Sequence, residues 1–180
     1  MTQAATLDLT KTVVLIMDFT KAIVEGYATD PKGVVERAAG VLAAARKAGV
    51  PVIHVVPTPR GDAAPASTIH PGVAPVPGEP VIAKARIGSF STTGLDAMLR
   101  QMGRDTLVLL GVATSGCVLS TARWAADVNY KLVVVTDACS DPDPAAHRAL
   151  TEREAYPKSF LGLWRLGTMM TAEEFSRAAV

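Results

Sequence analysis

Short apolar runs recur along the chain and alternate with stretches of helical periodicity. Nearly every position is apolar in five of these runs: 12–19, 51–56, 80–85, 106–112 and 131–138. Such continuous hydrophobicity, in place of strict alternation, is typical of strands that a parallel sheet buries on both faces. A shorter run at 165–170 is a candidate last strand.

The segments between these runs carry helical spacing and helix-end signals. Apolar residues recur at helical spacing in 33–49 and 92–103, and each segment ends at a glycine. Further helices are expected at 115–130, 143–155 and 171–179. Strand and helix therefore alternate, and this order predicts one α/β domain over residues 1–180. We expect three layers, α/β/α, around a mostly parallel, doubly wound sheet of five or six strands.

Charge and composition limit the classes of partner. Lys and Arg number 18 and Asp and Glu 17, so the formal charge is +1. Such a balance gives no electrostatic reason to expect nucleic acid or an anionic membrane. The first residues lack the basic start and apolar stretch of a signal peptide, and no apolar run approaches the length of a membrane span. We expect a soluble, cytoplasmic protein with two free thiols, Cys117 and Cys139.

Chemically capable residues follow several of the predicted strands. Ligands of open α/β sheets bind outside the carboxyl ends of the strands. The residues found there are Asp18 and Phe19, Lys84 and Arg86, the turn 111–117, and Asp137.

The turn that contains Cys117 has the glycine spacing of a phosphate-binding loop but not its lysine. Gly111 and Gly116 are separated by four residues, yet Cys117 and Val118 stand where Lys and Ser or Thr are needed. A cysteine at a helix start is favoured as a thiolate, and the free N–H groups there can hold an oxyanion. A small residue packed in the core explains it equally well. Cys139 lacks the helix start, and we assign it to the core.

Asp18 and Lys84 each have two interpretations. Asp18 follows five apolar residues, so it is either a general base or metal ligand, or a capping or solvated loop residue. Lys84 ends an apolar strand and is either a functional cation or a side chain that extends to the surface. Together with Cys117 they would supply a base, a cation and a nucleophile at one sheet edge, as nucleophilic catalysis requires.

Three sequence blocks in this order resemble the isochorismatase-like cysteine hydrolase family, which includes nicotinamidase and N-carbamoylsarcosine amidohydrolase. They are "VLIMDF", "KARIGSFSTTGLDAML" and "GVATSGCV", the last followed by an alanine-rich helix and a strand ending "TDACSD". The resemblance covers nearly the whole chain. It implies a catalytic triad of Asp18, Lys84 and Cys117. It also implies a cis peptide between Val112 and Ala113, with the N–H groups of Ala113 and Cys117 as the oxyanion hole.

The presence of Cys117 favours the amidase branch of this family, because isochorismatase itself lacks the nucleophilic cysteine. The activity implied is hydrolysis of a non-peptide C–N bond, in an amide, ureido compound or lactam, through a thioester and without a cofactor. Alternatives are a different hydrolase activity on the same fold, a thiol redox or sensor protein that uses Cys117, a nucleotide-binding protein and a non-catalytic interaction module. The sequence has neither a Walker lysine nor a Cys-x-x-Cys pair for the nucleotide and redox alternatives.

The histidines do not form the metal motif of nicotinamidases, which place Asp-x-His after the second strand. His54 lies within a strand, where we expect it to be hydrogen bonded, and His70 lies in a loop near the mouth of the site. His147 is assigned to a solvated helix face. We therefore expect no metal ion, because a metal needs several converging ligands.

The substrate pocket and the oligomeric state rest on weaker signals. Candidate pocket residues are the aromatic and basic side chains nearest the predicted site: Phe19, Arg86, Phe90, Tyr156 and Trp164. Each has plain packing or surface exposure as an alternative. The long Pro-, Gly- and Ala-rich stretch 57–80 is expected to be functional or mobile. The apolar, irregular segment 156–167 favours burial by a partner subunit, and the family resemblance implies a homodimer or homotetramer.

Overall fold

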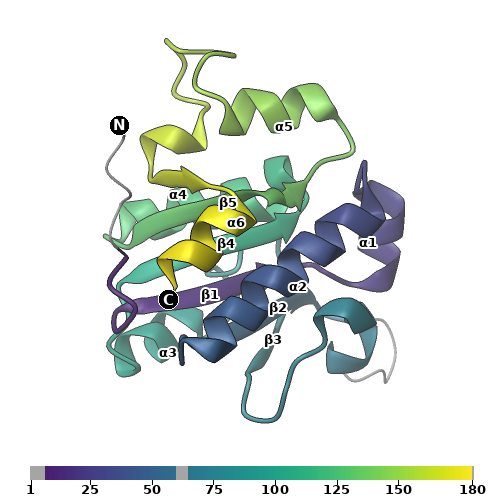
Figure 1. Ribbon diagram of the computed structural model, residues 1–180, viewed down its shortest axis with the longest axis vertical. Coiled ribbons are helices and arrows are strands. Elements are labelled where there is room, and N and C mark those ends of the chain that lie inside the picture. The colour runs from purple at the N-terminus through teal and green to yellow at the C-terminus, as the bar shows by residue number, and fades with distance from the viewer. Residues whose placement is uncertain (1–6, 60–64, 180) are drawn as a thin grey trace.

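Six parallel strands form one sheet at the centre of the computed structural model, which describes residues 7–59 and 65–179 (Figure 1). In chain order they are β1 Thr12–Met17, β2 Val52–Pro57, β3 Val81–Lys84, β4 Thr106–Val112, β5 Lys131–Ser140 and β6 Thr168–Met170. Their order across the sheet is β3-β2-β1-β4-β5-β6, and every neighbouring pair is parallel. The predicted doubly wound α/β class is confirmed, and the run at 165–170 does contain the last strand.

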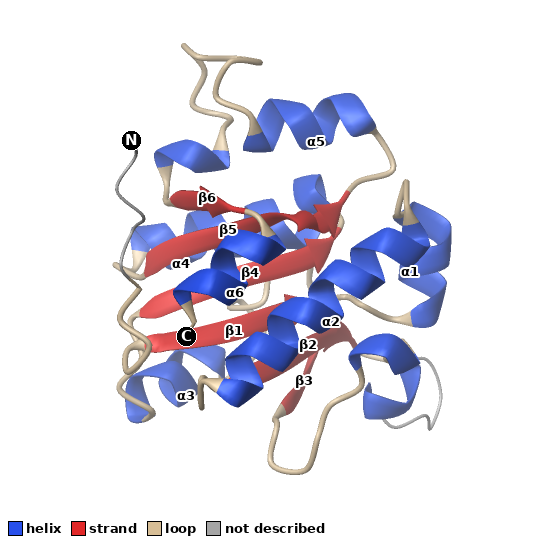
Figure 2. Cartoon of the chain, in the orientation of Figure 1, coloured by secondary structure: helices blue, strands red, loops and turns tan. Residues whose placement is uncertain are grey.

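Helices cover both faces of this sheet (Figure 2). One face carries α2 Pro31–Lys47 and α6 Ala172–Ala178, and the other carries α3 Leu95–Gln101 and α4 Leu119–Asp127. Two further helices, α1 Lys21–Tyr27 and α5 Pro144–Thr151, follow the carboxyl ends of β1 and β5. None of the helices in the described part of the chain is long and apolar enough to cross a membrane.

The central strand β1 shows why the apolar runs are continuous. Val13, Leu15 and Met17 pack against the α3 and α4 side, whereas Val14 and Ile16 pack against the α2 and α6 side. All five side chains are at most 1% exposed. Because successive residues of a strand point to opposite faces, a strand covered on both sides must be apolar at every position.

Several helix boundaries differ from the predicted ones. The segment 143–155 is helical only as far as Thr151, and the helix expected from residue 92 begins at Leu95. The short helix α1 was not predicted, since seven residues give too few turns for a periodic pattern. Helix α6 begins with the capping box of Thr171 and Glu174 that its sequence indicates.

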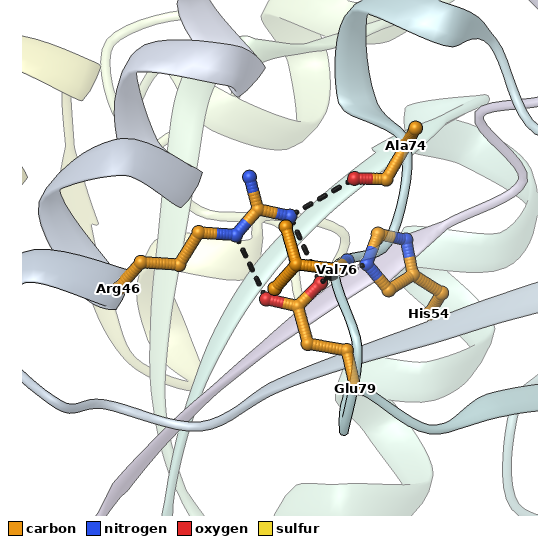
Figure 3. Close-up of polar contacts among 5 residues, drawn as sticks. All are labelled: Arg46, His54, Ala74, Val76 and Glu79. Atoms are coloured by element: carbon orange, nitrogen blue, oxygen red, sulfur yellow. Dashed lines mark hydrogen bonds and ion pairs between the residues drawn. The ribbon is translucent and has the colours of Figure 1, made fainter.

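The long connection between β2 and β3 ends in a polar cluster built on Glu79 (Figure 3). The Glu79 carboxylate accepts hydrogen bonds from Arg46 Nε at 2.8 Å, from the Val76 amide at 3.0 Å and from His54 Nε2 at 3.0 Å. Arg46 also donates to the Ala74 carbonyl at 3.0 Å. His54 is thus hydrogen bonded, as expected of a strand histidine, and the cluster ties the connection to β2 and α2.

The other part of this connection that the structure describes contains two short turns, η1 Pro65–Thr68 and η2 Pro71–Val73. His70 begins the second turn, where its Nδ1 accepts a hydrogen bond from the Gly72 amide at 3.1 Å. Its own amide donates to the Phe19 carbonyl at 2.8 Å. His70 is therefore a loop residue with a local structural contact.

We expect Glu79→Gln to reduce the free energy of unfolding by up to about 3 kcal/mol at neutral pH. The ion pair and hydrogen bonds lower the pKa of Glu79 from 4.5 to about 2, whereas burial keeps His54 neutral by lowering its pKa. A depressed carboxyl pKa contributes stability above the unfolded value and loses it as the pH falls towards 2. Urea unfolding of both proteins between pH 7 and 3 should therefore show the difference narrowing below pH 4.5. A constant difference would contradict this assignment.

Candidate active site

Asp18 follows β1 at the point where the order of strands reverses direction across the sheet. Its φ is +60°, in the left-handed region that Asp tolerates better than most residues, and its amide donates to the Val55 carbonyl at 2.8 Å. Asp18 thus lies at the carboxyl end of β1, next to the switch point between β1 and β4 where doubly wound sheets bind ligands. The side chain is buried, and its Oδ1 has no well-formed hydrogen bond to a described residue.

Lys84 reaches Asp18 from β3, which is not the neighbour of β1. The strand β2 lies between them, so the lysine side chain extends across the end of β2, where Pro57 is paired with Lys84. Its Nζ lies 2.9 Å from Asp18 Oδ2 and donates to the carbonyls of Ile87 at 2.8 Å and Arg86 at 3.2 Å. The Lys84 side chain is 4% exposed, and its ammonium group contacts these three oxygen atoms. Lys84 is a buried cation and does not extend to the surface.

Cys117 lies in a single π-helical turn, Thr114–Val118, which connects β4 to α4. A cis peptide bond joins Val112 to Ala113 just before this turn. The Ala113 carbonyl accepts hydrogen bonds from the amides of Gly116 at 3.1 Å and Val118 at 3.4 Å, and from Cys117 Sγ at 3.6 Å. Three donors of the turn therefore converge on the Ala113 carbonyl group, and the Cys117 thiol is one of them.

Gly111 leaves the space that this thiol occupies. A Cβ at Gly111 would lie 2.7 Å from Val118 Cγ2, 3.0 Å from Cys117 Sγ and 3.3 Å from the Met17 carbonyl oxygen. A Cβ at Gly116 would meet only Ala113 Cβ, at an ordinary 3.9 Å. The two glycines with phosphate-loop spacing therefore have different roles, and only Gly111 is required by the close approach of its neighbours.

Residues at and just after the end of β5 anchor this turn through hydrogen bonds. Asp141 Oδ2 accepts a hydrogen bond from the Ser115 amide at 2.7 Å, and Thr114 Oγ1 donates to the Ser140 carbonyl at 3.2 Å. His147 Nδ1 lies 2.8 Å from the same Thr114 Oγ1. The assignment of His147 to a solvated helix face is wrong, because the imidazole is partly buried and burial lowers its pKa. The sequence block "TDACSD" ends at Asp141, but nothing in that block indicates that this residue anchors the turn.

Burial dominates the electrostatics of the thiol and the carboxylate. It raises the pKa of Cys117 well above its usual value, and the neighbouring Asp18 raises it further, whereas Lys84 lowers it. Burial also raises the pKa of Asp18, against the opposing effects of Lys84 and the Cys117 thiol. Burial and the neighbouring Asp18 therefore oppose the effect of the helix start, which favours the thiolate.

Asp18, Lys84 and Cys117 line one pocket of about 780 Å³. The rest of its lining is largely apolar and comes from α1, from the end of β2, from the segment after β3 and from the turn after β4. These residues are Ile23, Tyr27, Pro57, Ala85, Arg86, Ile87, Val112, Ala113 and Gly116. Ile23 and Tyr27 belong to the helix that the sequence did not reveal.

Only Arg86 among the five predicted pocket residues lines this pocket. Phe19 and Phe90 are core residues, 2% and 6% exposed, and Phe90 packs against Tyr130 with ring centroids 5.8 Å apart. Tyr156 is exposed and lies in the irregular segment after α5. The Arg165 guanidinium carbon lies 4.4 Å from the centroid of the Trp164 ring. Both phenylalanines lie in the irregular segments that follow β1 and β3, and their rings pack into the core. The irregular segment that carries Tyr156 and Trp164 has no periodic pattern from which to place these two side chains.

Asp137, also noted at a strand end, serves a structural role. Its Oδ1 accepts a hydrogen bond at 2.7 Å from the amide of Ala172, the first residue of α6. Within residues 7–59 and 65–179 no group of three or more His, Cys, Asp or Glu side chains is arranged to hold a metal ion.

These features define a doubly wound α/β protein with a buried carboxylate, ammonium and thiol around one pocket at the reversal of strand order. The profile of the isochorismatase domain matches residues 12–174, and the chain belongs to the isochorismatase family. An isochorismatase family protein from Burkholderia thailandensis has the same fold, with a TM-score of 0.79 and 29% identity over 98% of this chain and 99% of that one.

Two curated relatives carry the names of hydrolases. Streptothricin hydrolase from Streptomyces noursei is 33% identical over 165 residues, which cover 85% of this chain and 58% of that protein. Maleamate amidohydrolase from Pseudomonas putida is 31% identical over 143 residues, covering 68% of this chain and 67% of that one. The chain thus spans little more than half the length of the streptothricin hydrolase.

We expect Gly111→Ala to lower the free energy of unfolding by about 1–3 kcal/mol, because the added methyl group overlaps Val118 and the Cys117 sulfur. The displaced thiol should also react with iodoacetamide at a changed rate, measured by mass spectrometry of the Cys117 peptide. Gly40→Ala in α2 is the matched control, since its Cβ would meet nothing within 4 Å. Equal effects of the two substitutions would contradict the assigned role of Gly111.

Thr114→Val should reduce the free energy of unfolding by about 1–3 kcal/mol, because it leaves the Ser140 carbonyl and the His147 ring without the hydroxyl. Thr114→Ser keeps the hydroxyl and should retain most of the stability. Urea unfolding at neutral pH measures both variants. If the valine variant matches the wild type, Thr114 does not anchor the turn.

Proposed function

We propose that this chain is a cysteine-dependent hydrolase of a non-peptide C–N bond in an amide, ureido compound or lactam. The observation that carries the proposal is the buried ion pair of Lys84 and Asp18, 2.9 Å long, in the same pocket as the Cys117 thiol. A base, a cation and a nucleophile meet there, as they must for nucleophilic catalysis. Two of the relatives described above are named for hydrolysis, one of them as an amidohydrolase.

The first step is proton transfer from Cys117 to Asp18. The Asp18 Oδ1 atom is buried and has no well-formed hydrogen bond to any residue of 7–59 and 65–179, so it is an available acceptor. Burial raises the pKa of Asp18 towards the working pH, which makes this carboxylate a stronger base than an exposed one. The positive charge of the Lys84 ammonium group stabilises the thiolate that forms, because it lowers the pKa of Cys117.

The thiolate then attacks the substrate carbonyl carbon, and the electron pair of the C=O bond moves to oxygen. The backbone N–H groups of Ala113 and Cys117 are the proposed donors to this oxyanion, a contribution typically of about 3–4 kcal/mol for each donor. When the C–N bond breaks, the protonated Asp18 gives its proton to the departing ammonia or amine. Water hydrolyses the thioester with Asp18 as base, which restores the thiol. No cofactor enters this sequence.

Cys117→Ala tests the proposal directly. The variant should lose at least about a thousandfold in turnover, because no other group in the pocket replaces the sulfur nucleophile. Ammonia release is measured over a panel of small amides, ureido acids and lactams, with Cys139→Ala as the matched control for loss of a buried thiol. Undiminished turnover by the Cys117 variant would overturn the cysteine mechanism.

The pH dependence of kcat/KM tests the role of Asp18. Only the ionised carboxylate accepts a proton, so the rate should rise with pH through the pKa of Asp18. Because burial raises this pKa, the acid limb should lie above the ordinary range of a carboxyl group. Asp18→Asn should abolish the limb together with most of the activity. An acid limb at the usual carboxyl pKa would contradict the proposed base.

A further inference from the structure

Arg86 brings a positive charge to the pocket that no described residue neutralises. It lies at the exposed rim, two residues after Lys84, and contributes to the lining. Its guanidinium group makes no ion pair or hydrogen bond within residues 7–59 and 65–179, whereas most arginines of the described chain contact a carboxylate, a carbonyl or an aromatic ring.

The other charges of the pocket cancel. Asp18 and Lys84 form a buried ion pair, and every other described residue of the lining apart from Arg86 is uncharged. The described lining therefore carries a net positive charge, which the exposed Arg86 supplies. An anionic group would be drawn to Arg86, because its charge is the one in the described lining that no neighbouring charge cancels.

Lys84 holds the backbone segment that carries this charge. The Lys84 ammonium donates to the carbonyls of Arg86 and Ile87, so the backbone that carries the guanidinium is tied to the ion pair. The same segment places Ile87 at the rim, 64% exposed, and Tyr27 faces the pocket from α1, 54% exposed. The rim thus combines one cation with apolar side chains.

We propose that Arg86 is a specificity-determining residue, which selects amides that carry a carboxylate a short apolar spacer away from the scissile C–N bond. The inference rests on the proposed function, since it names the substrate class of the same pocket. A guanidinium binds a carboxylate through two parallel hydrogen bonds, and the apolar lining contacts the spacer. Neutral amides lack the charged contact, and cationic amides meet repulsion.

The first experiment measures the charge preference of the pocket without any turnover. Iodoacetate and iodoacetamide differ only in charge, and each alkylates a thiol by displacing iodide while the thiol proton passes to the base. The rate ratio of iodoacetate to iodoacetamide at Cys117 is measured for the wild type, Arg86→Gln, Arg86→Lys and the control Arg177→Gln on α6. Peptide mass spectrometry separates Cys117 from Cys139.

The ratio at Cys117 should fall about tenfold in Arg86→Gln, as expected for the loss of one charge a few ångströms from the reagent. Arg86→Lys should keep most of the ratio and Arg177→Gln all of it. A ratio that Arg86→Gln leaves unchanged overturns the inference, and so does an equal fall in Arg177→Gln.

The second experiment compares two amides of the same shape, succinamate and 4-methylpentanamide, which differ in a carboxylate and an isopropyl group. The wild type should favour succinamate in kcat/KM, chiefly through KM, and Arg86→Gln should reduce that preference at least tenfold. A wild type that hydrolyses 4-methylpentanamide as well as succinamate overturns the inference and leaves the proposed function standing. Absence of Cys117-dependent turnover on the whole panel would reject the proposed function, whereas the alkylation ratio would still report the charge at Arg86.

Discussion

The ion pair between Lys84 and Asp18 is the contact on which the rest of the site depends. It joins two strands that are not neighbours, across the end of β2, and so connects the edge of the sheet to its centre. An ion pair buried this deeply is weak evidence for stability, because desolvation offsets much of the Coulomb attraction. In the proposed function the pair has a chemical role, because Lys84 favours the ionised form of the carboxylate beside the thiol. The same ammonium group also holds the segment that carries Arg86.

The turn after β4 shows how one glycine spacing can serve two kinds of site. Both a phosphate loop and this turn place backbone N–H groups at the start of a helix, where partial positive charge accumulates. In this chain the requirement for glycine comes from the Val118 side chain and the sulfur of Cys117, which leave no room for a Cβ at Gly111. The second glycine has ample space, so its agreement with the phosphate-loop pattern carries no steric information. A spacing motif is therefore informative only when each of its positions has a physical reason.

Much of the fold followed from the sequence because burial on both faces leaves a continuous apolar signal. The apolar signal ends at the carboxyl end of each strand. Asp18, Lys84 and the turn of Cys117 could therefore be assigned to one edge of the sheet from the sequence alone. The other residues of the pocket could not be predicted from the sequence, because their place depends on the direction in which each side chain points. Phe19 is one residue from Asp18 yet lies in the core, and Ile23 and Tyr27 come from a helix too short to show a period. His147 was misplaced because its partner, Thr114, is 33 residues away.

Burial of the Cys117 thiol favours its neutral form and so opposes the effect of the helix start. A resting thiolate would need stabilisation at all times, yet desolvation and the nearby carboxylate both favour the neutral thiol. Lys84 is the opposing charge, and it is already paired with Asp18. In the proposed mechanism, that pairing weakens once Asp18 takes the thiol proton, and the ammonium becomes available to the new thiolate. The proton would move between two groups that share a single cation, so the net charge of the buried cluster would stay constant through the step. A step without a change in net charge requires little reorganisation of the surroundings, which suits a buried site.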